Sequence, residues 1–373
     1  METKKYRFDE VTINFDKKRI PLSSAQREKR QGTFRYYGAQ GVIDHVDDYI
    51  YDGTYLLIAE DGENLKSKKQ NIAQVVDGQF WVNNHAHIVQ GNEQCDTRFL
   101  CYLINSMDLS GYVTGSAQPK LSQAYLNAIT LSLPTLVEQK RIVEYLYMLD
   151  QKIDVNRQIN DNLEAQALAL FSDFVSQHNE KWEQGKLGDV ISSANTGGDA
   201  IQKVPIVDYD TGIKCARVGD ITNAREFASW AFCSATNSVF DNYKLQAGDI
   251  LVTRTATLGI TQYIPSDISA VYNNGLIRLK TDNNRALPLY VYLAINTSDF
   301  MNYINQMNSA TSVRPNMKID YLLNYQLLIP PIEKQIQFVK AVEVLMNAIS
   351  LNNNERLKLC DFQSTLLNTL SRR

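Results

Sequence analysis

The sequence predicts an α+β protein in which two mixed α/β domains are separated by two long helices that pair as an antiparallel coiled coil. Apolar residues recur at alternating steps of four and three from residue 142 to residue 174, which places them on one helical seam. The pattern returns at an offset of 196 residues, the separation of Ile142 and Phe338. This internal duplication predicts mixed α/β domains at 1–133 and 180–329, long helices at 134–179 and 330–373, and an approximate two-fold axis.

The first domain reads as alternating short strands and turns. β-like runs occur at 55–58, 80–82 and 87–89, and Asp-Gly pairs between them are typical of turns. A helix is expected over 98–107, and the alternating run 129–133 is expected to be the strand that leads into the first long helix. These elements predict a mixed α/β domain.

The first long helix has both a start signal and a continuous seam. Thr135 and Glu138 have the spacing of a capping box, which satisfies two amide donors at a helix N-terminus. A helix of about 40 residues is roughly 60 Å long and needs a partner of similar length. Its predicted seam residues are Ile142, Leu146, Leu149, Ile153, Asn156, Asn160, Leu163, Ala167, Leu170 and Phe174.

The second domain and helix repeat this plan with different side chains. Asn83-Asn84 before a strand is matched by Asn273-Asn274, and the second helix opens at Pro330. Asn156 and Asn352 occupy matching seam positions, where a buried Asn fixes register. Arg356 and Gln363 interrupt the apolar seam of the second helix, which indicates either contacts with another chain or a more solvated helix end. The seam residues are Phe338, Val342, Leu345, Ile349, Asn352, Leu359, Leu366 and Leu370. The alternative is that both helices belong to two ordinary globular cores.

Composition places the chain among soluble folded proteins. It has 373 residues, 44% of them hydrophobic and 21% charged, with no apolar run long enough for a membrane helix. The N-terminal residues lack the apolar core of a signal peptide, and five cysteines without C-x-x-C spacing favour reduced thiols in the cytoplasm. A net charge of −3 argues mildly against a nucleic-acid binder that acts alone.

Motifs for catalysis and for metal binding are weak or missing. The sequence contains no P-loop, no G-x-G-x-x-G after a strand and no Asn-Pro-Pro or Asp-Pro-Pro motif of amino-methyltransferases. His85 and His87 alternate on one predicted strand face and could bind a metal. Because no cysteine or carboxylate cluster supports them, a surface or core role explains them better, and we expect no metal and no cofactor.

Signals for nucleic-acid binding are stronger than those for catalysis or metal binding. Two modules on a rigid spacer suit a ligand with two sites at a fixed distance, as duplex DNA offers. The basic loop 66–69 suits phosphates, and Arg254 follows an apolar strand as a candidate for a guanine edge or a phosphate. An ordinary solvated loop or a packing role explains several of these residues equally well. The candidate DNA contacts are Tyr37, Gln40, Lys66, Lys68, Lys69, Gln118, Lys120, Arg217, Arg254, Thr255, Asn274, Arg314 and Lys318.

The helical region resembles a known family. The string Pro134-x-x-x-Glu138-Gln139-x-x-Ile142-Val143, followed by Leu149-Asp150-x-Lys152-Ile153, Asn156 and Asn160, is similar to the helical region of specificity (S) subunits of type I restriction–modification enzymes. Tyr36-Tyr37-Gly38-Ala39-x-Gly41 and Gln118-Pro119-Lys120-Leu121 resemble stretches of that family's recognition domains. The likeness covers essentially the whole chain, although Lys334 and Met346 depart from the pattern in the second helix.

The resemblance implies a non-catalytic DNA-recognition subunit. Each recognition domain would read one half of a bipartite double-stranded DNA site, and the coiled coil would set the gap. Two modification subunits would dock on the spacer helices, bind S-adenosylmethionine and methylate a flipped adenine. Restriction subunits would add ATP-driven cleavage. Neither cofactor is expected on this chain.

Two other classes of function remain open from the sequence. The chain could be a DNA methyltransferase or nuclease in its own right, against which the missing catalytic motifs argue. It could also be a coiled-coil adaptor that binds only proteins. DNA binding with a modification subunit separates the recognition role from the adaptor, and turnover by the chain alone separates it from an enzyme.

Overall fold

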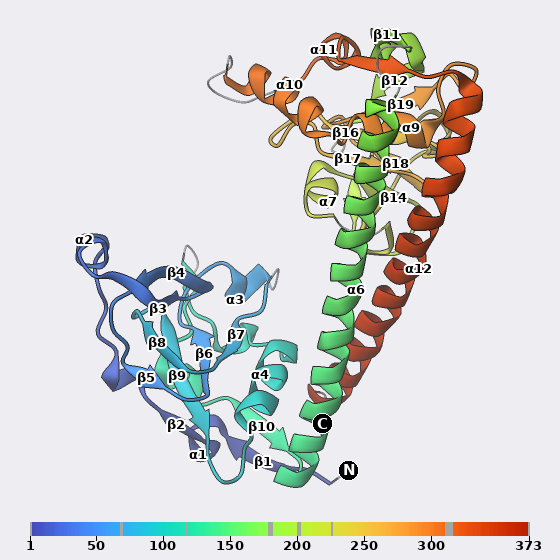
Figure 1. Cartoon of the computed structure of the whole chain (residues 1–373). Helices are drawn as coiled ribbons and strands as arrows, with labels where there is room; N and C mark the ends of the chain where they lie inside the picture. The colour runs from blue at the N-terminus through green and yellow to red at the C-terminus, as the bar shows by residue number, and fades with distance from the viewer. Residues whose placement is uncertain are drawn as a thin grey trace. The chain divides into compact units, whose positions relative to one another are not determined.

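The computed structural model of the chain divides into two compact units (Figure 1). The structure describes residues 2–67, 70–115, 118–177, 182–199, 203–224, 227–309 and 316–371. The first unit comprises residues 1–154 and 358–373, and the second comprises residues 155–357. Each unit therefore contains one of the two mixed α/β domains and a part of each long helix. The domain boundaries expected at 133/134, 179/180 and 329/330 stay predictions.

The first unit consists of short strands and helices that precede the first long helix. In chain order they are β1 (Lys4–Arg7), α1 (Phe8–Val11), β2 (Thr12–Asn14), η1 (Asp16–Lys18), α2 (Ser24–Glu28), β3 (Gln31–Gly38), β4 (Gly41–Val46), β5 (Tyr51–Asp52), β6 (Tyr55–Ala59), α3 (Asn64–Ser67), β7 (Ala73–Val76), β8 (Gln79–Val82), β9 (Ala86–Gly91), α4 (Thr97–Ser106), η2 (Ser110–Tyr112), α5 (Gln123–Asn127) and β10 (Thr130–Leu133).

Three sheets form the first domain. Their strand orders are β2-β9-β6-β7, β4-β3-β8-β5 and β1-β10, and every pair is antiparallel except β3 with β8. Strand β6 is buried along its whole length because it lies inside its sheet, which explains its unbroken apolar run. A core that includes Leu56, Phe99 and Leu131 joins this sheet to α4 and β10.

The second unit repeats two of these sheets and the parallel pair of the third. Its elements are β11 (Glu183–Lys186), η3 (Leu187–Val190), β12 (Ile191–Thr196), β13 (Ile206–Val207), β14 (Lys214–Ala216), α7 (Val218–Thr222), η4 (Phe227–Ser229), β15 (Ala231–Cys233), α8 (Asn237–Tyr243), β16 (Ile250–Thr253), β17 (Thr261–Tyr263), β18 (Ala270–Tyr272), β19 (Leu276–Thr281), α9 (Pro288–Ala294), α10 (Ser298–Ser309), α11 (Ile319–Leu323) and β20 (Gln326–Ile329). The orders β12-β19-β16-β17 and β11-β20 match those of the first domain, and β14 pairs with β18 in parallel as β3 does with β8.

The two long helices, α6 (Leu136–Ser176) and α12 (Ile332–Ser371), begin in the same way. The Gln139 side chain is fully buried; it donates to the carbonyl of Pro134 at 2.9 Å and accepts from the amide of Asp96 at 2.9 Å. The Gln335 side chain makes the equivalent bonds: it donates to the carbonyl of Pro330 at 2.8 Å and accepts from the amide of Leu287 at 2.9 Å. Each helix is thus tied to the domain that precedes it by one buried amide.

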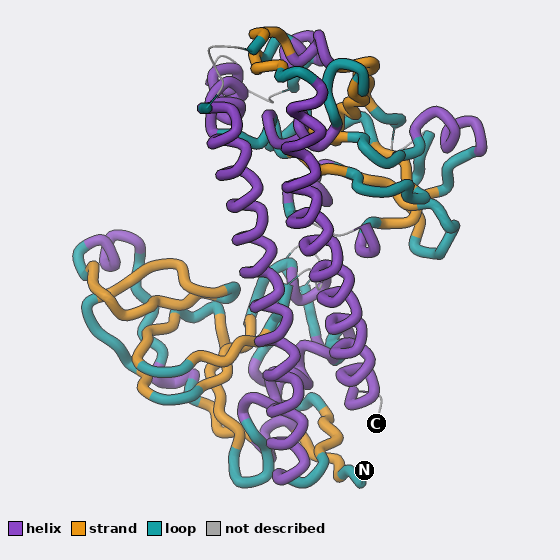
Figure 2. The backbone as a smooth tube through the Cα atoms, turned by 45° about the vertical axis from the view of Figure 1, so that its right-hand side comes forward, coloured by secondary structure: helices purple, strands orange, loops and turns teal. Residues whose placement is uncertain are grey.

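Within the second unit, the parts of α6 and α12 are antiparallel. The rings of Phe174 and Phe338 stack with centroids 4.5 Å apart, whereas Asn156 Nδ2 donates to Glu355 Oε2 at 2.8 Å. Lower numbers in α6 therefore face higher numbers in α12. Asn160 lies between these contacts and donates to Asn353 Oδ1 at 2.6 Å. In Figure 2, α6 and α12 are the two longest purple helices.

The helix segments of the first unit run in the same antiparallel sense. Gln363 Nε2 donates to Asp150 Oδ1 at 2.6 Å, and the Tyr102 hydroxyl of α4 donates to the other oxygen of Asp150. Leu367, farther along α12, packs against the core together with Ile142 and Val143, which come earlier in α6. Gln363 thus contacts its own chain.

Most predicted seam residues are buried or half-buried, but the prediction for Leu170 is wrong. Leu170 is 44% exposed, and Phe171 is 6% exposed and packs beside Phe338. A straight helix has 3.6 residues per turn and drifts by about 20° per heptad against a 3.5-residue repeat, so after four heptads the buried face moves on by about one residue. The side chain of Leu370 lies outside the described residues. The other predicted residues with buried or half-buried side chains are Ile142, Leu146, Leu149, Ile153, Asn156, Asn160, Leu163, Ala167, Phe174, Phe338, Val342, Leu345, Ile349, Asn352, Leu359 and Leu366.

In the part of the chain that the structure describes, no helix combines the length and the apolarity needed to cross a membrane.

Candidate nucleic-acid interface

In the second domain, three segments meet where strands end. Arg254 follows β16, Asn274 follows β18, and Met317 precedes α11. The backbone of Arg254 binds both neighbouring segments: its amide donates to the Gly275 carbonyl at 2.9 Å, and its carbonyl accepts from the amide of Met317 at 2.8 Å. These bonds fix the backbone, so the direction in which the Arg254 side chain leaves the sheet is also fixed.

The Arg254 guanidinium is held by backbone oxygens. Its Nε donates to the carbonyl of Met317 at 3.2 Å, and its Nη1 donates to the carbonyl of Asn274 at 3.3 Å. Among the residues that the structure describes, no carboxylate pairs with Arg254, which is half-buried. A preorganised guanidinium of this kind suits an anion or a guanine edge supplied from outside the chain.

The other predicted DNA contacts of the second domain differ in their exposure and in the partners that they already have. Arg217 is less available, because its Nε binds the buried carboxylate of Asp220 at 3.1 Å. Thr255 is half-buried and forms an isolated backbone bridge with Asn316. Asn274 and Lys318 are exposed, and Arg314 lies outside the described residues.

The first domain has the same backbone arrangement, with Glu60 in the place of Arg254. The Glu60 amide donates to the carbonyl of His85 at 2.9 Å, and the Glu60 carbonyl accepts from the amide of Leu121 at 2.8 Å. Asn83 also caps its loop as its counterpart Asn273 does: the side-chain oxygen accepts an amide two residues on, at 2.8 and 3.1 Å. The two domains thus carry opposite charges at one equivalent position.

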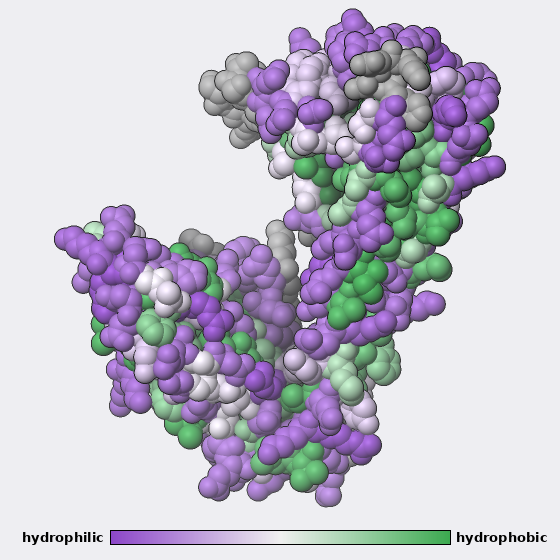
Figure 3. Space-filling view, in the orientation of Figure 1, coloured by the Kyte–Doolittle hydropathy of each residue, from purple (hydrophilic) through white to green (hydrophobic). Residues whose placement is uncertain are grey.

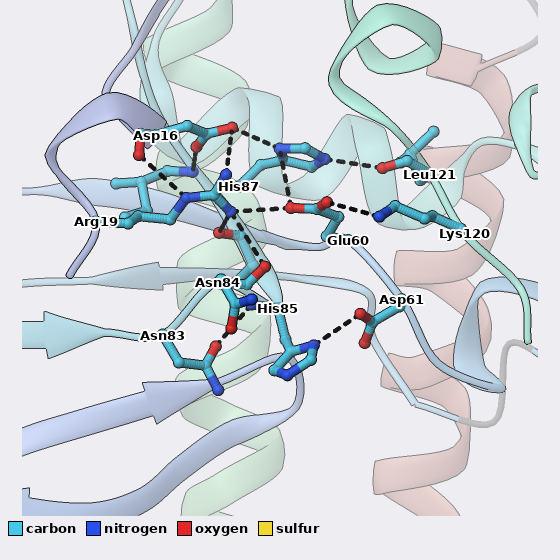
Figure 4. Close-up of polar contacts among 12 residues, drawn as sticks. Asp16, Arg19, Glu60, Asp61, Asn83, Asn84, His85, His87, Lys120 and Leu121 are labelled. Carbon is cyan, nitrogen blue, oxygen red and sulfur yellow. Dashed lines mark hydrogen bonds and ion pairs between the residues drawn. The ribbon is translucent and has the colours of Figure 1, made fainter. Parts of the chain in front are cut away.

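Glu60 is paired with two cations (Figure 4). Arg19 Nη1 lies 2.9 Å from Glu60 Oε2, and Lys120 Nζ lies 3.2 Å from Glu60 Oε1. Burial opposes ionisation of Glu60, but the hydrogen bond from Arg19 and the charge of His87 outweigh it and hold its pKa below the ordinary value. Lys120 is 53% exposed, so one cation of this cluster reaches solvent.

Behind Glu60 lies a buried histidine. His87 is 1% exposed; its Nδ1 lies 2.7 Å from Asp16 Oδ2, and its Nε2 lies 2.8 Å from the carbonyl oxygen of Leu121. Burial also opposes ionisation of Asp16, but hydrogen bonds from His87 and from the Ile88 amide lower its pKa. His85 is instead 48% exposed and binds Asp61 at 2.7 Å. The two histidines therefore have separate carboxylate partners.

Of the candidate contacts in the first domain, Tyr37 is wrong. It is 4% exposed and packs edge-on against Phe80, because β3 lies inside its sheet and turns this ring into the core. Gln40 is exposed at the turn before Gly41, whose φ of 127° suits glycine. Lys66 is exposed and donates to the carbonyl of Gly115 at 2.7 Å. Gln118 and Lys120 are exposed as well, whereas Lys68 and Lys69 lie outside the described residues.

Sequence reasoning missed Glu60, Arg19, Asp16 and the role of His87. The offset between equivalent residues changes along the domains: it is 194 from Glu60 to Arg254 but 190 from Asn84 to Asn274. A fixed offset of 196 therefore does not bring these positions together. Aligning the Asn-Asn pairs first, and then each preceding strand, is the signal that would have found Glu60.

The family of the chain follows from its relatives. The family described as "Type I restriction modification DNA specificity domain" matches residues 2–165 and 179–359. A putative type I restriction enzyme specificity subunit, S.HindORF215P of Haemophilus influenzae, is 27% identical over 353 residues, which are 92% of this chain and 88% of that protein. The specificity subunit of type I restriction enzyme MjaVIII of Methanocaldococcus jannaschii is 21% identical over 75% of this chain and 71% of that protein.

A solved structure has the same fold. The S subunit of a type I restriction–modification system from M. genitalium matches with a TM-score of 0.58 at 14% identity, over 99% of this chain and 96% of that one. The repeated sheets and long helices are thus the architecture of an S subunit. Since the family matches nearly the whole length in two segments, the chain belongs to the type I restriction–modification DNA specificity family and carries two of its domains.

Proposed function

We propose that this chain is the DNA specificity subunit of a type I restriction–modification enzyme and has no catalytic activity alone. Each recognition domain reads one half of a bipartite DNA site, and the paired helices set the gap and hold the modification subunits. The observation that carries this proposal is Arg254: its guanidinium is fixed by two carbonyls and has no carboxylate partner among the described residues. DNA supplies the phosphate or base-edge acceptor that Arg254 does not find among the described residues.

The two domains differ where they would meet DNA, which supports an asymmetric site. Arg254 in the second domain suits the two acceptors of a guanine edge. The equivalent residue of the first domain is Glu60, and there the exposed cation is Lys120, held at 3.2 Å from that carboxylate. Side chains of opposite charge at one equivalent position favour different bases, so the two half-sites should differ in sequence.

The long helices support two identical partners. Met148 and Val344 occupy equivalent positions of the repeat and are 50% and 67% exposed. Val155 and Leu351 occupy a second pair of equivalent positions and are 45% and 70% exposed. Exposed apolar residues that recur in this way are typical of protein contacts, and Figure 3 shows hydrophobic surface, in green, over the part of the view where the helices run. We infer one modification subunit for each copy of the repeat.

The chemistry then belongs to the partners. Modification subunits would bind S-adenosylmethionine and methylate adenine, and restriction subunits would use ATP, so this chain itself needs neither cofactor. A cytoplasmic location is part of the proposal, because the substrate is DNA and the five cysteines are free thiols.

The test is selection of methylated sequences from a library of randomised duplexes by the full chain together with its modification subunit. We expect a two-part site. Arg254→Gln should relax one half-site by roughly tenfold to a hundredfold and leave the other intact, since a bidentate arginine contributes about 1–3 kcal/mol of base discrimination.

A matched control is Arg285→Gln in the same unit, because Arg285 pairs with Glu183 at 3.0 Å and is not in the proposed interface. It should leave both halves unchanged. Arg254→Gln could instead weaken binding to all sequences equally and lower the slope of log binding constant against log salt concentration by about 1. In that case Arg254 contacts phosphate. Methylation by the chain without a partner, or a selected site without two parts, would overturn the proposed function.

A further inference from the structure

The β3–β4 hairpin of the first domain carries apolar residues that face solvent. Its strands are joined by a short turn, Ala39 and Gln40. Val42 and Ile43, which follow this turn in β4, are 44% and 53% exposed. Strand β4 lies at the edge of its sheet, where proteins ordinarily place charged residues that discourage contacts. Two neighbouring exposed aliphatic side chains at such an edge indicate a contact surface.

The backbone gives Ile43 a special place in the hairpin. Asp44 and Val42 have partners in β3, whereas Ile43, between them, has none, so it is the extra residue of a β-bulge. Bulges re-aim a side chain and are frequent beside functional sites. Gly38 makes room for it, since a Cβ on Gly38 would lie 3.1 Å from Ile43 Cγ2 and 3.5 Å from Asn83 Nδ2. The Ile43 and Asn83 side chains therefore lie on the same side of Gly38 (Asn83 is labelled in Figure 4).

The turn of the hairpin lies beside the candidate interface of the first domain. Gln40 Nε2 is 3.5 Å from the position that a Cβ on Gly62 would take. The Gly62 amide donates to the carbonyl of Pro119 at 3.1 Å, and Pro119 precedes Lys120. In Figure 1, β4 and α3 lie at the same end of the first unit. The exposed apolar residues thus continue a surface that already offers an amide and a cation.

The second domain does not repeat this hairpin. Its counterpart of β4 is β15, which pairs antiparallel with β14 as β4 does with β3. A longer segment, residues 217–230, replaces the short turn and contains α7 and η4. In β15, Ala231 and Phe232 are half-buried and Cys233 is buried. The fold therefore does not require the exposed apolar pair, which is a property of the first domain.

The hairpin matches what an A·T base pair presents in the major groove. That groove admits a two-stranded β-ribbon, and an A·T pair shows there the N6 and N7 atoms of adenine and the methyl group of thymine. An amide side chain suits the first feature and an aliphatic side chain the second, and Gln40 and Ile43 offer both. The neighbouring carboxylate of Asp44 is paired with Arg27 Nε at 2.8 Å, so it does not face DNA as an unpaired charge.

We propose that Ile43 contacts the 5-methyl group of a thymine in the half-site of the first domain and thereby selects an A·T pair at that position. The inference rests on the proposed function and adds a specificity-determining residue to it. The contact removes exposed aliphatic surface of Ile43 from water, which is favourable only where a base carries an apolar group. Cytosine and uracil lack this methyl group.

The test replaces single thymines of the selected site by deoxyuridine, which keeps the base pair and lacks only the 5-methyl group. Dissociation constants of the full chain with its modification subunit are measured for each duplex by fluorescence anisotropy. The half-site of the first domain is the one that Arg254→Gln leaves intact. We expect one deoxyuridine in that half-site to weaken binding by about fourfold, the fold-change that corresponds to burial of one methylene-sized group.

Ile43→Ala should remove this effect. The variant should bind the thymine duplex about fourfold more weakly than the wild type, and deoxyuridine should weaken its binding no further, because both changes remove the same contact. Ile13→Ala is the matched control. Ile13 is 49% exposed in the edge strand β2 and pairs with Gln90, toward the end of β9 that is farther from Asn83. This variant should behave as the wild type with both duplexes.

Three results would overturn the inference and leave the proposed function standing. Deoxyuridine at every thymine of that half-site could leave wild-type binding unchanged, or the deoxyuridine effect could survive Ile43→Ala. Ile43→Ala could also release the modification subunit, which would assign the hairpin to a protein contact. A complex that selects no two-part site would instead refute the proposed function.

Discussion

At the scale of single residues, Asp16 holds the buried network of the first domain together. It is 7% exposed, and its carboxylate binds His87, the Ile88 amide and Arg19. Its pKa is lowered in the folded protein from the ordinary value of 3.8. A depressed carboxyl pKa means that the stabilisation is fully present above that ordinary value and is lost as the pH falls through the folded pKa.

Asp16→Asn should therefore destabilise the first domain by about 3 kcal/mol near neutral pH, because it removes the buried carboxylate that His87, the Ile88 amide and Arg19 contact. The deficit should shrink as the pH falls below about 4, because the wild-type carboxyl then takes up a proton first in the unfolded chain and, at lower pH, in the folded domain. Urea unfolding followed by circular dichroism at both pH values measures it. Asp48→Asn is the control, since Asp48 is 61% exposed and lies 3.8 Å from Arg30, and it should change little. An Asp16→Asn deficit that is equal at both pH values would contradict the account.

The sequence singled out the more accessible residues of the candidate site and missed the buried ones. Arg254 and Lys120 stay predicted DNA contacts; they were selected because a polar or basic residue beside an apolar strand or a Pro turn is a local signal. The pairs His87–Asp16 and Arg19–Glu60 join residues 71 and 41 positions apart, and no local pattern reports such a contact. Tyr37 failed for a related reason: which face of β3 is covered depends on β8, a strand far along the chain.

At the scale of elements, the seam of the second unit contains two asparagines with different surroundings. Asn156 donates to Glu355, an exposed residue that has further contacts. Asn160 binds two asparagines of α12: it donates to Asn353 at 2.6 Å and accepts from Asn352 at 3.2 Å. Removal of Asn156 leaves its partner in water, whereas removal of Asn160 leaves two half-buried amides without this partner.

The same substitution should therefore have opposite effects at the two positions. Asn156→Leu should be neutral or raise the melting temperature, because it adds apolar burial to the seam. Asn160→Leu should lower the free energy of unfolding by about 1–3 kcal/mol, the cost of unsatisfied buried amides. Thermal and urea unfolding of the two variants checks this. A sharp fall for Asn156→Leu would mean that its bond to Glu355 matters more than burial.

The helices were the most predictable elements because their signal is local and repeated. The capping box is present, with the Glu138 amide donating to Thr135 Oγ1 at 3.3 Å and the Thr135 amide donating to Glu138 Oε2 at 3.1 Å. Among the seam side chains that the structure describes, the strict heptad failed only at Leu170, where drift of the helix brings Phe171 into the seam. The buried role of Gln139 and Gln335 was not predicted, because their partners are loop residues of the preceding domains.

At the scale of the whole molecule, duplication explains both the likeness and the difference of the two halves. The orders of two sheets and the helix starts are repeated, so they are the features that the fold needs twice. The residues at the ends of β6 and β16 are not repeated, since Glu60 stands where Arg254 stands. Changes at these ends leave the sheets intact, so each domain can alter its DNA preference without losing its fold.

The same duplication predicts how many partners bind. Val155 and Leu351 are exposed and equivalent, so each should lie in the contact with one modification subunit. Val155→Glu should remove one subunit from the complex and Leu351→Glu the other, because a charge in an apolar contact is left desolvated and unpaired. Light scattering should then show one bound subunit for each single variant and none for the double variant.

Val137→Glu provides the control for this count. Val137 is 79% exposed at the start of α6, and its equivalent in α12 is Glu333, so it is not part of the repeated apolar pattern. The variant should keep both subunits bound. Loss of both subunits in either single variant would mean that they bind only as a pair. Retention of both in the double variant would show that the partners dock elsewhere, and the repeated exposure of these helix positions would then need another explanation.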